Sequence, residues 1–174
     1  NMGILRPGGT ELTRHALECA KVKKGSALLD IGCGDGTAAA YAKEQFELEV
    51  TAIDIDETAI AKAKEKGVHA LRGDASMLEF SSRTFDAVMM ECVFSVLDRQ
   101  EEALHEAFCM LRPGGKLIIS DVYSRQPDME RYEREHLAAL KQFYRPREHN
   151  ECDSGEHLPS PYCQDGAVVM KGLE

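Results

Sequence analysis

A glycine-rich turn beside an acid is the first part of this sequence that could bind a ligand. Residues 29–37 read LDIGCGDGT, an apolar stretch that runs into three closely spaced glycines. Gly32 and Gly34 would allow a ligand to approach the backbone closely. The dinucleotide fingerprint G-x-G-x-x-G requires a glycine where this chain has Thr37. Asp30 would repel a phosphate and suits a cationic amine instead. A tight turn without any ligand is the alternative interpretation.

A second acid follows the next apolar stretch. Asp54 ends residues 48–54, which read LEVTAID, and lies 24 residues after Asp30. A carboxylate at the tip of a second strand can accept hydrogen bonds from both hydroxyls of a ribose. Asp56 is the competing acid, although its place before a helical segment suits an N-cap. Taken by itself, Asp54 is equally compatible with an ordinary loop position.

Two further pairs of residues stand at comparable places. Asp74 and Ala75 follow the third strand-like segment, and Glu91 and Cys92 stand at the end of the fourth. Because ligands of open α/β sheets bind at the carboxyl ends of the strands, residues at these places can share one site. An Asx-type turn is the alternative interpretation of Asp74.

The elements that must position these residues alternate along the chain. The expected strands cover residues 26–31, 48–54, 68–72, 85–91 and 116–122. The expected helices cover residues 10–21, 37–46, 57–66, 98–111 and 128–144. Apolar strands that alternate with helices suit a parallel sheet covered on both faces. The sequence therefore predicts an α/β fold with a doubly wound, mostly parallel sheet.

Local signals set the ends of two of these helices. Asp56 is a plausible N-cap for residues 57–66, and Gly67 stands directly after that segment. Asp98 with Glu101 three residues later resembles a capping box for residues 98–111. A Pro-Gly-Gly sequence at 113–115 is expected to end that helix.

Composition limits the classes of function. The chain has 174 residues and a net charge of −9, which favours one globular domain and disfavours nonspecific nucleic-acid binding. No stretch approaches the ~20 apolar residues that span a bilayer, so no membrane association is expected. Six cysteines without a CxxC pair predict a reduced, cytoplasmic chain with buried thiols.

The ordered series of motifs resembles class I S-adenosylmethionine (SAM) methyltransferases, over roughly residues 10–123. The resemblance implies a Rossmann-like fold and SAM as cofactor. It implies that Asp30 helps to hold the methionine amino group and that Asp54 binds the ribose. It also implies that Asp74 binds the adenine N6 amine and that the Ala75 N–H binds N1. The residues assigned to the cofactor in this way are Asp30, Gly32, Cys33, Gly34, Asp54, Ile55, Asp74, Ala75, Glu91 and Cys92.

Methyl transfer requires little acid or base catalysis by side chains. The reaction is an in-line displacement at a sulfonium carbon, and alignment in an apolar pocket is the main requirement. A general base is needed only where the acceptor must lose a proton. We therefore assign no catalytic residue and no metal site, and we expect a small-molecule acceptor.

A narrower resemblance connects the chain to arsenite methyltransferases. It rests on residues 92–98, on residues 120–123 and on residues 163–167, in which Cys163 would match a metalloid-binding cysteine. A thiolate suits trivalent arsenic, with Cys92 or Cys152 as the second ligand. An ordinary loop thiol is the alternative for Cys163. A SAM-binding protein without catalysis is a further alternative, and Thr37 and Asp30 oppose a nicotinamide dehydrogenase.

The expected organisation has three parts. Residues 1–24 form an N-terminal cap and helix, residues 25–124 form the SAM-binding core, and residues 125–174 form a C-terminal helix and an acceptor-side loop. The final hairpin of the family has no signal in the last part, so we expect a fragment of a longer protein. The unpaired edge of the fifth strand would then favour a homodimer.

Overall fold

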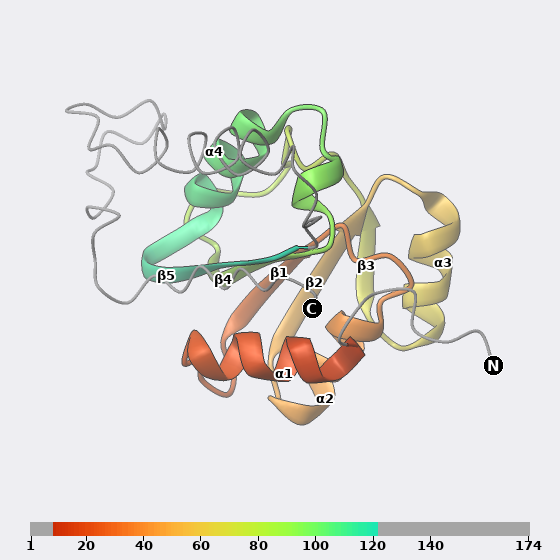
Figure 1. Cartoon of the computed structure of the whole chain (residues 1–174), viewed down its shortest axis with the longest axis vertical. Helices are drawn as coiled ribbons and strands as arrows, with labels where there is room; N and C mark the ends of the chain where they lie inside the picture. Colours follow the sequence, from red (N-terminus) through yellow and green to blue (C-terminus); the bar gives the residue numbers. More distant parts are fainter. Residues whose placement is uncertain (1–8, 122–174) are drawn as a thin grey trace, which may run out of the picture.

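A five-stranded sheet runs through the computed structural model, which describes residues 9–121 (Figure 1). The strands are β1 Ala27–Ile31, β2 Glu49–Asp54, β3 His69–Arg72, β4 Phe85–Glu91 and β5 Leu111–Ser120. Their order is β3-β2-β1-β4-β5, and every neighbouring pair is parallel. The strand order reverses between β1 and β4, which confirms the doubly wound α/β fold.

Helices cover both faces of the sheet. They are α1 Gly9–Cys19, α2 Thr37–Gln45, α3 Glu57–Glu65 and α4 Gln100–Met110, with a 3₁₀ turn, η1 Phe94–Val96, after β4. The core on one face combines residues of α1, α2 and α3 with the sheet, and the core on the other combines α4 with the sheet. Figure 1 shows α1 and α2 on the side opposite α4.

Alternate residues of the central strands enter the two cores. Leu28 and Met89 pack on the side of α1, whereas Leu29 and Met90 pack on the side of α4. Strands buried on both faces lose their polar alternation, which explains the continuous apolar runs in the sequence. Among residues 9–121, no helix is long and apolar enough to cross a bilayer.

The predicted ends of α3 are confirmed, and the predicted start of α4 is wrong. The Asp56 side chain accepts a hydrogen bond from the Thr58 N–H at 2.8 Å and caps α3. Helix α4 instead begins at Gln100 after Arg99, and no side chain caps it. The chain leaves η1 in an extended conformation at Leu97, and the cap position lies at Arg99, one residue later than the capping-box pattern predicts.

The fifth strand begins earlier than predicted because it contains a bulge. The pairing with β4 shifts from Phe85↔Leu111 to Ala87↔Lys116, so the Pro-Gly-Gly sequence lies within β5. In this bulge Arg112 donates to both carboxylate oxygens of Asp86 at 2.9 Å. One of these oxygens also accepts the Ala27 N–H at 2.8 Å. Asp86 therefore joins the amino-terminal ends of β1, β4 and β5.

Several expectations concern residues outside the described part of the chain. These are the helix at 128–144, the absence of a final hairpin and the acceptor-side loop. The division into three parts and the homodimer remain predictions.

The packing of α2 against α3 explains why residue 36 is a glycine, and this provides a test of the fold. A Cβ on Gly36 would lie 2.5 Å from the Cβ of Ala63, and the residue has φ +75. Gly67 has φ +74 but no atom within 4 Å of its Cβ position. Gly67→Ala should cost about 1 kcal/mol for the left-handed backbone alone. Gly36→Ala should cost about 1–3 kcal/mol more, because it also overpacks α2 against α3.

Urea unfolding of both variants measures this difference in the free energy of unfolding. Equal losses in the two variants would show that the contact between α2 and α3 does not require glycine at position 36.

Candidate functional site

The glycine loop, residues 32–36, lies against the end of β2. The N–H groups of Gly32 and Cys33 both donate to the Ile53 carbonyl, at 2.9 and 3.0 Å. The Gly34 N–H donates to Asp54 Oδ2 at 2.8 Å. The structure therefore brings together the glycine loop and the second acid, at the place where the strand order reverses. Open α/β sheets bind their ligands at this position.

The first two glycines of the loop have different roles. A Cβ on Gly32 would lie 2.4 Å from Val93 Cγ2, so this position is closed by the loop after β4. Gly34 has φ +54 and no atom within 4 Å of its Cβ position. The space beside Gly34 is open, whereas the predicted close approach of a ligand at Gly32 is wrong on the side where Val93 lies. Ligand binding at Gly34 stays a prediction.

Asp54 is fixed in place by backbone groups. Its Oδ1 accepts the Asp56 N–H at 3.0 Å, in addition to the bond from Gly34 to Oδ2. An ionised carboxylate offers about four lone-pair directions, so both oxygens can accept further hydrogen bonds. Asp56 is occupied as the cap of α3. Ile55 exposes 67% of its surface beside Asp54, which places an apolar side chain next to the proposed ribose acid.

Asp74 forms the Asx turn that was its alternative interpretation. Its Oδ1 accepts the N–H of Ser76 at 2.8 Å and the hydroxyl of Ser76 at 2.7 Å. These hydrogen bonds lower the pKa of the Asp74 carboxyl from its ordinary value. The Asx turn uses only Oδ1, so the adenine role of Asp74 and Ala75 stays a prediction.

A cluster of four buried polar residues lies between α1 and the carboxyl ends of the central strands. Asp30, Glu91, Ser120 and Thr13 are all buried. Thr13 Oγ1 donates to Glu91 Oε2 at 3.1 Å, and Glu91 is aligned with Ser120 across β4 and β5. Buried carboxylates require hydrogen bonds, so this contact helps to fix α1 on the sheet.

Sequence reasoning missed Thr13, although a signal was present. Thr13 is a lone polar residue on the buried face of α1, together with Ala16 and Leu17. A polar side chain on an apolar helix face needs a buried partner. The identity of that partner depends on the fold, because Glu91 is 78 residues away.

Asp35 was also missed, and it stabilises the end of the glycine loop. It accepts hydrogen bonds from the Thr37 N–H at 3.1 Å and from Lys66 Nζ at 2.6 Å. Partial burial raises the pKa of Asp35, but the bonds from Lys66 and Thr37 outweigh it and lower the pKa below its ordinary value. The contribution of these bonds to the free energy of unfolding is fully present above the unfolded-state pKa of Asp35. It is lost as the pH falls through the lower folded-state pKa of the same carboxyl.

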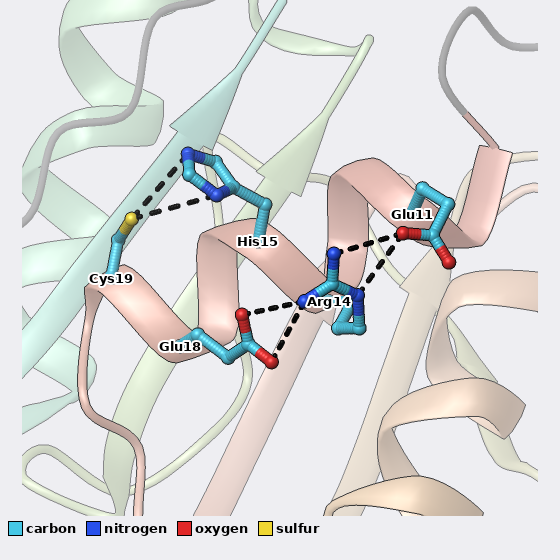
Figure 2. A network of polar contacts seen from close by, with 5 residues as sticks. All are labelled: Glu11, Arg14, His15, Glu18 and Cys19. Atoms are coloured by element: carbon cyan, nitrogen blue, oxygen red, sulfur yellow. Dashed lines mark hydrogen bonds and ion pairs between the residues drawn. The ribbon is translucent and has the colours of Figure 1, made fainter.

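The outer face of α1 is polar (Figure 2). Arg14 lies between Glu11 and Glu18 and forms ion pairs with both at 2.9 and 2.8 Å. His15 Nε2 lies 3.5 Å from the sulfur of Cys19, which is exposed. The expectation that the cysteines are buried is therefore wrong for Cys19, because it lies on the solvent side of an amphipathic helix.

The other predicted thiols differ in environment. Cys33 is buried in the glycine loop, and Cys92 is partly buried with a positive φ of 55°. Cys152 and Cys163, the further metalloid candidates, lie outside the described residues. Within residues 9–121, no three His, Cys, Asp or Glu side chains gather into a group that could hold a metal ion.

The parallel sheet and its flanking helices define a Rossmann-like domain, with the glycine loop and the strand-end acids as a candidate ligand site at its carboxyl edge. A family model described as a methyltransferase domain matches residues 29–119, more than half of the chain. The chain therefore belongs to the methyltransferase-domain family, and its resemblance to class I SAM-dependent methyltransferases is confirmed.

Individual relatives show what the chain is similar to. The uncharacterized methyltransferase YodH of Bacillus subtilis is 32% identical over 127 residues, which cover 70% of this chain and 54% of YodH. Phosphoethanolamine N-methyltransferase 1 of Arabidopsis thaliana is 30% identical over 131 residues, which cover 72% of this chain and 26% of the plant protein. The chain thus spans only about a quarter to a half of these relatives.

A solved structure shows the same fold. Phosphoethanolamine N-methyltransferase 2 of Haemonchus contortus, in complex with SAM, aligns with a TM-score of 0.66 at 24% identity. The alignment covers 82% of this chain and 38% of that one.

The environment of Cys33 provides a test of the glycine loop. Burial, together with the charges of Asp30 and Asp54, raises the pKa of the Cys33 thiol to about 12. Only the thiolate reacts with alkylating reagents, so Cys33 should stay unmodified at pH 8 while exposed Cys19 reacts. Peptide mass spectrometry after treatment with iodoacetamide measures both sites, and urea-unfolded protein shows that both can react. Modification of Cys33 at the rate of Cys19 in the folded chain would contradict the burial of the loop.

Proposed function

We propose that this chain binds SAM at the carboxyl edge of its sheet and transfers the methyl group to a small-molecule acceptor. The observation that carries the proposal is the hydrogen bond of 2.8 Å between the Gly34 N–H and Asp54. This bond places a carboxylate with remaining acceptor capacity directly beside the open space at Gly34.

The donor set fits the chemical parts of SAM. Asp54 can accept from the two ribose hydroxyls, and exposed Ile55 offers an apolar surface for the adenine ring. Asp30 places a negative charge behind the loop, which suits the cationic amino group of the methionine part rather than a phosphate. In this proposal, Asp74 and Ala75 bind the adenine edge, and Gly32, Cys33, Gly34, Glu91 and Cys92 surround the methionine part.

The contribution of the protein to the reaction is alignment. SAM supplies an electrophilic methyl group on a sulfonium sulfur, and a neutral sulfide leaves. The chain fixes the backbone of the glycine loop on β2 and closes it from the other side with Val93. A rigid loop holds the ligand in one orientation, which lowers the entropic cost of reaching the in-line geometry.

The acceptor class is suggested by relatives. Several relatives at about 30% identity are phosphoethanolamine N-methyltransferases, whose name gives an amine as acceptor. Phosphoethanolamine is therefore the first acceptor to test. Formation of S-adenosylhomocysteine from SAM, with and without this compound, measures the activity.

The ribose assignment can be tested with a matched pair of variants. Asp54→Ala removes hydrogen bonds between a charged acceptor and two hydroxyls, and it should weaken SAM binding about ten- to a hundredfold. Asp56→Ala, two residues away, removes the cap of α3 and should cost about 1 kcal/mol of stability with SAM affinity unchanged. Isothermal titration calorimetry measures the affinities. An Asp54→Ala variant with parental affinity would refute the ribose role, and equal weakening by both variants would assign the effect to the fold.

A further inference from the structure

The loop after β4, residues 92–96, is held by the residue that follows β5. One carboxylate oxygen of Asp121 accepts the Ser95 N–H at 2.7 Å, and the other accepts the Ser95 hydroxyl at 2.9 Å. Both bonds are partly buried, where charge-assisted hydrogen bonds are strong. Asp121 thereby fixes both the backbone and the side chain of one loop residue.

The start of the same loop is also attached to the end of β5. The Cys92 N–H donates to the Ser120 carbonyl at 2.7 Å. Cys92 has a left-handed backbone with φ +55, a conformation that costs energy for residues other than glycine. Such a turn persists only where surrounding contacts hold it, and the contacts with Ser120 and Asp121 do so.

The other side of the loop meets the glycine loop. Val93 lies so close to Gly32 that a Cβ there would be 2.4 Å from Val93 Cγ2. The loop 92–96 is therefore packed between the end of β5 and the glycine loop. Ser95, which Asp121 holds, is two residues from Val93, which lies against Gly32.

The topology indicates which part of the cofactor this loop serves. If the proposed function holds, the ribose binds to Asp54 at the end of β2. The methionine part must then extend over β1 toward β4, because β2 and β4 flank β1 on opposite sides. The loop 92–96 stands at this end of the site, away from the nucleoside.

We propose that Asp121 is a positioning residue for the methionine end of SAM, acting through Ser95 and Val93 on the glycine loop. It contacts neither nucleoside nor sulfur in this proposal. Its loss should weaken ligands that contain the amino-acid part and should leave ligands with only the nucleoside part unaffected. The inference rests on the proposed function.

Two ligands separate these effects without knowledge of the acceptor. S-adenosylhomocysteine contains the amino-acid part, whereas 5′-methylthioadenosine has the same nucleoside and sulfur without it. Asp121→Ala should raise the Kd of S-adenosylhomocysteine about tenfold or more and leave the Kd of 5′-methylthioadenosine unchanged. Asp121→Asn should keep most of the affinity, because its amide can accept from the Ser95 N–H and donate to the Ser95 hydroxyl.

Asp86 provides the matched control. It also bridges elements through a backbone N–H and a side chain, but at the amino-terminal end of the same strands. Asp86→Ala should lower the melting temperature without changing the ratio of the two Kd values. Ser95→Ala removes only the hydroxyl bond and should show a smaller selective loss, which also serves as the test if Asp121→Ala does not fold.

The outcomes are distinct. If the parent chain binds neither ligand, the proposed function is wrong and the inference fails with it. If the parent binds both and the Asp121 and Ser95 variants weaken both ligands equally, or neither, Asp121 has no positioning role and the proposed function stands. A selective loss restored by Asp121→Asn and absent in Asp86→Ala supports the positioning role.

Discussion

The attachment of the glycine loop to the end of β2 is the constraint on which the rest of the site depends. Three successive backbone N–H groups, from Gly32 to Gly34, are bonded to Ile53 and Asp54. This leaves the loop with little freedom, and it orients the Asp54 carboxylate before any ligand binds. The space at Gly34 is open, whereas Val93 of the loop after β4 closes the position at Gly32. Preorganisation of this kind reduces the entropy lost on binding, so under the proposed function the contact that shapes the loop would also favour the ligand.

The polar residues at the carboxyl edge differ in their exposure, and this difference separates their roles. Asp54 and Asp74 are at least partly exposed and satisfied by nearby backbone groups. Asp30 and Glu91 are buried on the side of α1, and Glu91 accepts a bond from Thr13. Exposed acids can exchange water for a ligand at small cost, whereas buried acids must keep their hydrogen bonds. Under the proposed function, the buried pair would shape the wall of the site and the exposed pair would meet the polar parts of the ligand.

Much of the fold could be predicted because its signals are local. The Asp56 cap, Gly67 and the buried runs of β1 and β4 each depend on a few neighbouring residues. The errors have two sources. The early start of β5 involves pairing with β4 and a bond from Arg112 to Asp86, 26 residues away, whereas the late start of α4 follows a 3₁₀ turn directly before it. The proximity of the glycine loop and Asp54 was recognised from their spacing, whereas Thr13 and Asp121 could not be given partners until the strand order was known.

The two ends of the β4–β5 pair show how a parallel sheet separates stability from ligand binding. At the amino-terminal end, Asp86 joins three strands through Ala27 and Arg112. At the carboxyl end, Asp121 holds a loop whose Val93 packs against Gly32 of the glycine loop. Both aspartates use the same chemistry, a carboxylate shared between a backbone N–H and a side-chain donor. Because ligands of open α/β sheets bind at the carboxyl ends of the strands, the positioning role proposed for Asp121 rests on its place along the strands, and the same hydrogen-bond pattern gives Asp86 no such role.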